Sequence, residues 1–304
     1  MQQITDSAPH LRPYGWAPGD YLSTCLACQQ TFIGDKRAIS CHPCALRRFE
    51  KAHPETMTDD RRRVRQSFAV YLDQDGVVFD FDEGLRRLGF QPDPEYNKSS
   101  HAMNDEANLW KQGMYEVIKG TDFFARLPLM EGAVDLYAAV EDADPIFLTA
   151  SPKFGSTEDD FLTHPFFLGA AYHKRRAVEE VLLPQVARLR IHQLTGKEPQ
   201  AAVPRVRIED DRFICTTSAR KQEYMHRKHS PYQVLIDDRI ANCEAWAASG
   251  GIAILHTSAR SSITIFERLV DKVLAGETLE AGVLRTDFPQ SKQPKVNLAE
   301  VLGR

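Results

Sequence analysis

The sequence predicts an α/β protein, in which helices cover a mostly parallel sheet, with a small metal-binding module in front of it. Short apolar runs alternate with helix-like stretches from about residue 67 to residue 280, a pattern that is typical of such folds. Carboxylates and hydroxyls follow directly after several of these runs, and two C-x-x-C pairs lie near the N-terminus. At 304 residues the chain is long enough for one large domain and a small one.

The expected elements follow from the hydrophobic pattern. The apolar runs predict strands over 68–73, 145–150, 212–217, 232–238 and 251–257. The helix-like stretches predict helices over 82–89, 103–118, 131–141, 169–195, 240–249 and 261–275. The helix over 169–195 is the longest, and Pro184 inside it should produce a kink because proline lacks a backbone N–H.

The segments around the large domain differ from it in composition. We expect these segments: an irregular arm over 1–20, a cysteine-containing module over 21–50, a charged linker over 51–66, the α/β domain over 67–280 and a polar tail over 281–304. No internal repeat and no low-complexity tract interrupts this order.

Composition excludes some classes of protein. With 42% hydrophobic and 26% charged residues the chain is ordinary for a globular protein, and its net charge of -4 gives no overall reason to expect nucleic-acid binding. No apolar run approaches the roughly 20 residues that cross a bilayer. The N-terminus lacks the basic start and apolar stretch of a secretory signal. We therefore expect a cytoplasmic protein without membrane contact, and composition does not predict its oligomeric state.

Three of the expected strands end in polar residues. These residues, with those directly after them, are Asp73, Asp75, Thr149, Ser151, Asp237 and Asp238. Each group has an ordinary explanation on its own, because D-x-D-G is a common turn and paired acids often precede a helix. Together they would converge, since the carboxyl ends of parallel strands share one edge where ligands bind. Four clustered carboxylates would repel one another, and a hard divalent cation such as Mg²⁺ would relieve this.

The ordered motifs carry a family resemblance. The sequence D-Q-D-G-V, a strand ending in Thr/Ser, a lysine and a strand ending in Asp-Asp together resemble the haloacid dehalogenase superfamily of phosphatases. The stretches "DFFARLPLMEGAVDLYAAV" and "YQVLIDDRIANCEAWAASGGIAILHTSA" look like its 5′(3′)-deoxyribonucleotidase branch. The resemblance covers roughly residues 67 to 275 and implies a Rossmannoid parallel sheet with a small helical cap at about 77–130. Residues 153–210 form a longer insertion than that branch leads us to expect.

The resemblance also implies catalytic roles. Asp73 would attack phosphorus and form an aspartyl-phosphate, and Asp75 would act as general acid and then general base. Thr149 and Ser151 would bind the phosphoryl oxygens. Lys221 matches the lysine motif best and would balance the negative charge of the phosphoryl group.

A metal site and a base site follow from the same resemblance. Asp73, Asp237 and Asp238, with the backbone carbonyl of Asp75, would hold Mg²⁺. Aromatic residues of the expected cap are candidates for stacking on a nucleobase: Trp110, Phe123 and Phe124. Aromatic residues at this density also commonly form the core of a cap, and this alternative stays open.

The cysteine module has the spacing of a zinc site. Cys25, Cys28, Cys41 and Cys44 form two C-x-x-C pairs separated by 12 residues, which two tight turns can present to one tetrahedral Zn²⁺. Four protein ligands leave no open position, so the zinc would be structural. The module resembles small zinc ribbons that are attached to enzymes.

Basic residues are frequent in the N-terminal third. They are Lys36, Arg37, Arg47, Arg48, Arg61, Arg62, Arg63 and Arg65. Such a patch could contact a phosphate backbone, although a solvated face with compensating acids explains it equally well. The favoured hypothesis is a Mg²⁺-dependent phosphatase of (deoxy)nucleoside monophosphates. The alternatives are an enzyme that removes terminal phosphates from nucleic acid, guided by the zinc module, and a non-enzymatic zinc-ribbon interaction protein.

Overall fold

The computed structural model describes residues 9–27, 31–52, 60–92, 105–195 and 203–285. Its centre is a parallel sheet of six strands in the order β5-β4-β3-β6-β7-β8, which confirms the predicted α/β class. The strands are β3 (Phe68–Leu72), β4 (Ile146–Ala150), β5 (Phe213–Thr216), β6 (Tyr232–Asp237), β7 (Ile252–Leu255) and β8 (Gly282–Leu284). All five predicted strands are present.

The sixth strand, β8, was not predicted. It pairs in parallel with β7 through residues 282–284, inside the segment that we expected to be a polar tail. The α/β domain therefore extends to at least residue 284. The rest of the expected tail, residues 286–304, lies outside the described residues.

Strand β3 lies between β4 and β6 and is fully buried. Because side chains alternate between the two faces of a strand, its residues contribute to two separate cores. Phe68, Val70 and Leu72 belong to the larger core, and Tyr71 belongs to the smaller one with Trp246. Burial on both faces explains why β3 appears in the sequence as a continuous apolar run.

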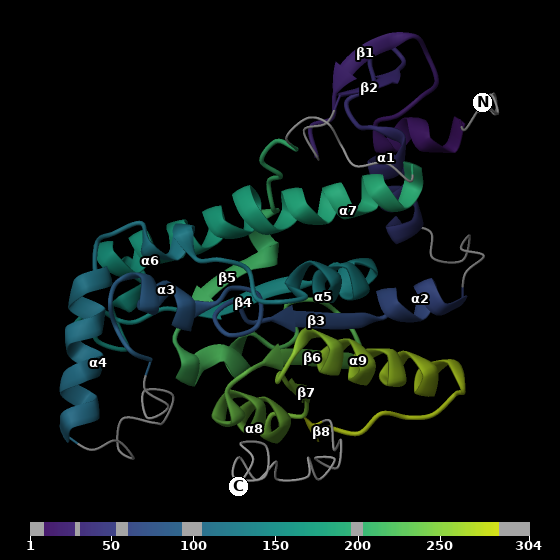
Figure 1. Ribbon diagram of the computed structural model, residues 1–304. Coiled ribbons are helices and arrows are strands. Elements are labelled where there is room, and N and C mark those ends of the chain that lie inside the picture. The colour runs from purple at the N-terminus through teal and green to yellow at the C-terminus, as the bar shows by residue number, and fades with distance from the viewer. Residues whose placement is uncertain (1–8, 28–30, 53–59, 93–104, 196–202, 286–304) are drawn as a thin grey trace, which may run out of the picture.

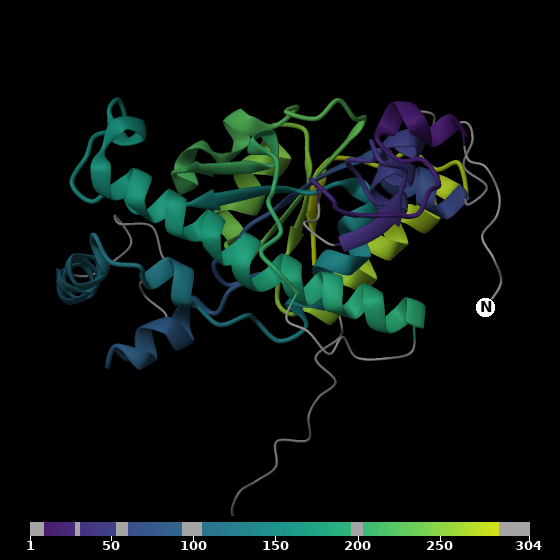
Figure 2. The ribbon, with the colours of Figure 1, turned by 90° about the horizontal axis from the view of Figure 1, so that it is seen from above.

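Helices cover both faces of the sheet. The helices of the domain and of its cap are α3 (Phe81–Arg87), α4 (Asp105–Ile118), α5 (Ala133–Val140), α6 (Pro165–Ala177), α7 (Leu183–Thr195), α8 (Ile240–Ala248) and α9 (Ala259–Leu274). Short 3-10 turns join them at Phe123–Arg126, Glu141–Ala143, Phe161–Thr163, Asp210–Arg212 and Ser218–Tyr224. Figures 1 and 2 show α3, α4 and the start of α6 grouped at the end of the domain where β3 ends. None of the described helices has the length and apolar character of a membrane span.

The expected cap between 77 and 130 is closed at its base. The amide of Met130 donates to the carbonyl of Val78, and the amide of Asp80 donates to the carbonyl of Pro128, both at 2.8 Å. Helices α3 and α4 project from this closed base. The cap therefore leaves and re-enters the sheet domain beside the carboxyl end of β3.

The predicted helix over 169–195 begins earlier, at Pro165, and contains a π-helical turn over Val178–Leu182. The turn lies directly before Pro184, which has no N–H to donate to the preceding turn. Glu179 in this turn accepts hydrogen bonds from Arg175 (3.1 Å), Arg205 (2.9 Å) and the amide of Ile208 (3.2 Å). The π-helical turn is therefore stabilised by a buried carboxylate that also holds the chain returning from α7.

The arm expected over 1–20 is ordered where the structure describes it. Residues Pro9–Tyr14 form a 3-10 helix, and Leu11 and Trp16 pack against Ala45 of α1 (His42–Ala52). Strands β1 (Tyr21–Thr24) and β2 (Thr31–Gly34) form an antiparallel pair beside them. The cysteine module thus spans residues 9 to 52 rather than 21 to 50, and its small core explains the correction.

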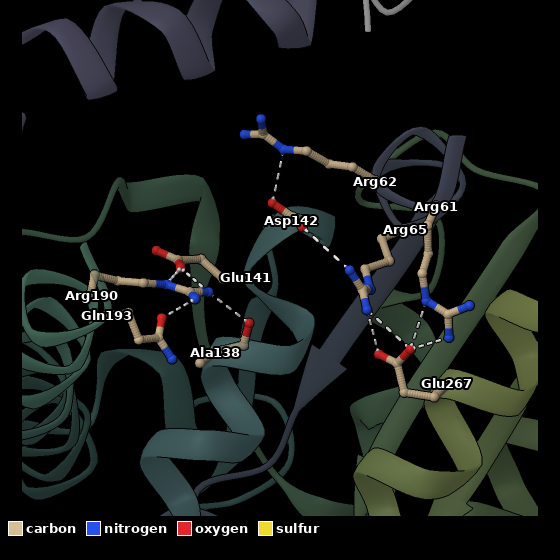
Figure 3. Close-up of polar contacts among 9 residues, drawn as sticks. All are labelled: Arg61, Arg62, Arg65, Ala138, Glu141, Asp142, Arg190, Gln193 and Glu267. Atoms are coloured by element: carbon tan, nitrogen blue, oxygen red, sulfur yellow. Dashed lines mark hydrogen bonds and ion pairs between the residues drawn. The ribbon is translucent and has the colours of Figure 1, made fainter. Parts of the chain in front are cut away.

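The linker expected over 51–66 is also partly helical. Helix α1 continues to Ala52, and α2 covers Asp60–Gln66. Arg61 and Arg65 both donate to Glu267 of α9, at 3.2 and 2.9 Å, and Arg62 donates to Asp142 at 3.1 Å (Figure 3). Helix α2 is therefore held on the α/β domain by paired charges, so these arginines are not a vacant surface for a phosphate backbone.

Candidate active site

The carboxyl ends of β3, β4, β5 and β6 open into one cleft of about 440 Å³, a volume within the usual range for small-molecule sites. The described residues that line it include Asp73, Asp75 and Gly76 after β3, Ser151 after β4 and Asp238 after β6. Residues that are up to 165 positions apart in the sequence therefore meet at one edge of the sheet, as the strand order requires.

Asp73 is paired with Lys221. The Nζ atom of Lys221, on the 3-10 turn after β5, lies 2.8 Å from Asp73 Oδ2 and 2.6 Å from Asp237 Oδ2. Burial alone would lower the pKa of Lys221, but the charges of Asp237 and Asp73 outweigh it and raise the pKa. Lys221 is therefore a permanent cation next to the expected nucleophile.

Asp75 has a lysine of its own, which the sequence did not predict. The Nζ atom of Lys174, in α6, lies 2.6 Å from Asp75 Oδ2 and 3.1 Å from Thr149 Oγ1. In the sequence Lys174 belongs to the run "HKRR" and has the look of an exposed basic cluster. Only the packing of α6 against the end of β3 turns this lysine inward, so no local signal identifies it.

Burial dominates the electrostatics of the acidic residues. It raises the pKa of Asp73, against the opposing charge of Lys221, and it raises the pKa of Asp75, against the opposing charge of Lys174. The pKa of Asp238 is raised furthest, by burial and then by the nearby charges of Asp237 and Asp73. Like charges in a poorly solvated cleft disfavour ionisation.

Carboxylate oxygens of Asp73, Asp237 and Asp238 lie within 4.8 Å of one another, so the three could hold a metal ion. Asp237, however, accepts four hydrogen bonds: from Lys221 (2.6 Å), from the amide of Arg239 (2.9 Å) and, with both oxygens, from Asn242 (3.0 Å each). A carboxylate has about four acceptor positions. Its acceptor capacity is thus already used.

Asp238 differs from Asp237 in this respect. It lines the cleft, and its carboxylate has no hydrogen bond or ion pair to any residue that the structure describes. The geometry therefore favours Asp238 and Asp73 as the carboxylates that face a cation, with Asp237 holding Lys221 in place. Oxygen donors of this kind suit Mg²⁺.

The expected phosphate-binding residues have different environments. Ser151 lines the cleft, although its amide donates to the carbonyl of Thr216 at 2.9 Å. Thr149 is fully buried beneath the cleft, where its hydroxyl accepts from Lys174. Two cleft-lining residues carry a buried oxygen without a hydrogen-bond partner among the described residues, namely Asp75 Oδ1 and Thr217 Oγ1. Buried polar atoms without a partner are uncommon in native proteins, and a bound water, an ion or a catalytic role accounts for many of them.

Only one of the expected base-stacking residues reaches the cleft. Phe124 lines it, whereas Trp110 packs edge-on against Phe90 and Phe123 packs edge-on against Phe81. Phe123 is 7% exposed and belongs to the main core. Trp110 and Phe123 thus follow the alternative of a cap core.

Other aromatic residues line the cleft instead. Phe81 and Tyr115 of the cap both face it, and burial raises the pKa of Tyr115 to about 12, so its hydroxyl stays protonated. They were not predicted because nothing in the sequence distinguishes a cap aromatic residue that faces the cleft from one that faces the core.

Positive side chains also line the cleft. Lys111 comes from α4, Lys153 follows β4 and Arg239 follows β6. Burial and the nearby charge of Arg239 lower the pKa of Lys111, while Lys153 lies 2.7 Å from Glu158. Two cations held near each other in a partly buried cleft favour an anionic ligand.

The cysteine module forms a second possible metal site. The sulfur atoms of Cys25, Cys41 and Cys44 lie within 4.8 Å of one another. The fourth predicted ligand, Cys28, lies outside the described residues. Thiolates are soft ligands, so this donor set suits Zn²⁺ and not the hard cation of the cleft.

Comparisons with known proteins do not assign the chain to a family. No protein-family model matches the chain, and no curated protein matches it. Any function must therefore be inferred from the residues of the site.

Proposed function

We propose that the protein is a Mg²⁺-dependent phosphomonoester hydrolase that acts through an aspartyl-phosphate. The observation that carries this proposal is the pair Asp73 and Asp75, each held by a different buried lysine, beside the carboxylate of Asp238, which has no partner among the described residues. The same residues carry the resemblance to the haloacid dehalogenase superfamily of phosphatases. Phosphoryl transfer depends chiefly on positioning and on charge neutralisation, which this arrangement supports.

The chain's own residues can perform both halves of the reaction. A carboxylate oxygen of Asp73 forms a bond to phosphorus while the ester P–O bond breaks, and Asp75 donates a proton to the leaving oxygen. Asp75 then takes a proton from a water molecule that attacks the aspartyl-phosphate, which releases phosphate and restores Asp73. Lys221 neutralises Asp73 throughout, and its pKa is high enough to keep it charged.

The charges of the site support a divalent cation. Asp73, Asp75, Asp237 and Asp238 bring four negative charges, and Lys174 and Lys221 offset two of them. Asp73, Asp238 and the backbone carbonyl of Asp75 would hold Mg²⁺, whose chemistry is to neutralise the phosphoryl oxygens during transfer. The Asp238 carboxylate has no partner among the described residues, which supports the assignment of a cation to this position.

The surroundings of the cleft support a small nucleotide as substrate, with (deoxy)nucleoside monophosphates favoured. Phe81, Tyr115 and Phe124 offer apolar surface for a base, and Lys111 and Arg239 offer positive charge. A nucleic-acid substrate is less favoured, because the arginines of α2 are engaged with carboxylates of the α/β domain (Figure 3).

We also propose that the cysteine module binds one structural Zn²⁺, with Cys28 as the fourth ligand. The module has only a small core around Leu11, Trp16 and Ala45, so a metal ion would supply much of its folding free energy.

The proposed activity is tested by measuring phosphate release from a panel of substrates with MgCl₂ and with a chelator. The panel contains deoxynucleoside monophosphates, ribose 5-phosphate and a 5′-phosphorylated oligonucleotide. We expect Mg²⁺-dependent turnover that Asp73→Asn abolishes, and a kcat/KM for a nucleotide at least about tenfold above that for ribose 5-phosphate. Equal rates for wild type and Asp73→Asn would refute the proposal.

A further inference from the structure

Lys174 is a buried cation whose head group is fully engaged inside the site. It is 1% exposed, and its Nζ atom lies 2.6 Å from Asp75 Oδ2, 3.1 Å from Thr149 Oγ1 and 4.4 Å from the ring centre of Phe124. An ammonium group has three N–H donors, so two hydrogen bonds and one cation–π contact use all of them. Lys174 is not among the described residues that line the cleft, so it can act on a substrate only through its neighbours.

The position of Lys174 is fixed by its backbone as well. The side chain of Gln74, which stands between the two aspartates, donates from Nε2 to the carbonyl oxygen of Lys174 at 3.2 Å. The π-helical turn begins four residues later, at Val178, and such turns are frequent at functional sites. Helix α6 is thus attached to the loop after β3 at two points, one through its backbone and one through its side chain.

The contact with Lys174 fixes the orientation of the Asp75 carboxylate. Lys174 occupies Oδ2, while Oδ1 is buried and has no hydrogen-bond partner among the residues described. Asp75 itself lines the cleft. A carboxylate whose orientation is fixed by an ion pair, and whose side chain is still 28% exposed, is suited to proton transfer, which depends on placing the donor within hydrogen-bond reach of the leaving oxygen.

The contact with Thr149 orients a hydroxyl. Since Lys174 has no acceptor, the Thr149 oxygen must accept this hydrogen bond, and its own proton remains available. Thr149 is fully buried and is not among the described residues that line the cleft, so this hydrogen bond fixes the position of the Lys174 ammonium group beneath the cleft.

We propose that Lys174 is a positioning residue that aligns the general acid Asp75 with the leaving group. The inference rests on the proposed phosphatase function and deepens it. Its contact with the ring of Phe124 ties this alignment to the cap, since Phe124 also lines the cleft. The lysine predicted from the sequence, Lys221, serves the nucleophile, and Lys174 serves the acid.

The test compares two leaving groups. An alkyl ester such as a deoxynucleoside 5′-monophosphate needs a proton on its leaving oxygen, whereas 4-nitrophenyl phosphate does not. In Lys174→Met we expect kcat/KM to fall about a hundredfold for the nucleotide and about tenfold or less for the aryl ester. The matched control is Lys119→Met, which removes a cap lysine that also has a cation–π contact, 5.0 Å from Phe166, and a carboxylate partner, Glu116.

Two results would overturn the role of Lys174. The first is an equal fall of kcat/KM for both esters in Lys174→Met, which a purely structural role predicts. The second is a Lys174 signal in ¹⁵N NMR of lysine side chains that does not shift between wild type and Asp75→Asn. We expect the buried ammonium group of Lys174 to give a slowly exchanging signal that does shift, because Asp75 is its partner. If Lys174→Met does not fold, Lys174→Arg replaces it, since arginine keeps the positive charge but places it differently. Its fall in kcat/KM for the nucleotide is compared with its fall for 4-nitrophenyl phosphate in the same way. A wild type that hydrolyses neither ester would refute the proposed function itself.

Discussion

The substitution Gly76→Ala should weaken metal binding by more than its effect on the stability of the fold explains. Gly76 has a φ of 77°, and a Cβ there would lie 2.7 Å from Asp238 Cγ and closer still to Oδ2. The Asp238 side chain is short, so Gly76→Ala forces this carboxylate to rotate away from Asp73. If Asp238 holds the cation, the substitution weakens metal binding without touching either catalytic aspartate.

The matched control is Gly276→Ala. Gly276 has the same φ of 77°, but a Cβ there would meet nothing within 4 Å. Each substitution places alanine in the left-handed region, which costs about 1–2 kcal/mol and lowers Tm by roughly 2–8 °C. Only Gly76→Ala adds the collision with Asp238, so the difference between the two variants isolates the effect on that carboxylate.

The assay is release of 4-nitrophenol from 4-nitrophenyl phosphate at increasing MgCl₂, with thermal unfolding measured in parallel. We expect the Mg²⁺ concentration for half-maximal rate to rise tenfold or more in Gly76→Ala. A tenfold rise corresponds to about 1.4 kcal/mol of binding free energy, and substitutions that disturb the orientation of metal ligands commonly weaken metal affinity by this much. Gly276→Ala should match wild type in this measurement. The same half-saturation in all three proteins would refute Asp238 as a metal ligand.

Three further predictions concern the cysteine module, the π-helical turn and helix α2. Cys41→Ser should reduce bound zinc from about one equivalent per chain to well below it; full zinc content in the variant would contradict the site. Burial tends to raise the pKa of Glu179, but hydrogen bonds from Arg205, the Ile208 amide and Arg175 lower it overall. Glu179→Gln should therefore lower the free energy of unfolding at pH 7 by about 2 kcal/mol in chemical denaturation. The difference from wild type should shrink as the pH falls below about 4, because a carboxylate with a lowered pKa stabilises the fold only while it is ionised. A difference that does not depend on pH would refute this. Glu267→Gln should lower Tm by a few degrees because Arg61 and Arg65 lose their shared partner, and an unchanged Tm would mean that the network contributes nothing.

Patterns that are local in the sequence predicted much of the fold. Strand β3 is a continuous apolar run because both of its faces are buried, and the acidic residues that follow β3 and end β6 stand out against the apolar residues before them. Strand β8 has only three residues and no such run, so it was missed. The order in residues 9–20 was missed because it depends on Leu11 and Trp16 reaching the core of the cysteine module.

The candidate site was predictable only in part. Asp73, Asp75 and Asp238 stand at strand ends, and topology alone brings them together. Tyr115 reaches the same cleft from a helix, and Lys174 reaches Asp75 from another, and the direction of both side chains depends on tertiary packing. The different roles of Asp237 and Asp238 could not be predicted either. The two are the same residue type at adjacent positions, and they differ only in their hydrogen bonds.

Trapping of the phosphoryl group on Asp73 tests the central proposal most directly. Asp75→Asn removes the base that hydrolyses the intermediate, while 4-nitrophenyl phosphate needs no proton to lose its leaving group. With Mg²⁺ and substrate labelled on phosphorus, acid-quenched Asp75→Asn should carry close to one label per chain, on the peptide that contains Asp73. Release of 4-nitrophenol by this variant without any label on the protein, or with the label on another residue, would contradict Asp73 as the nucleophile.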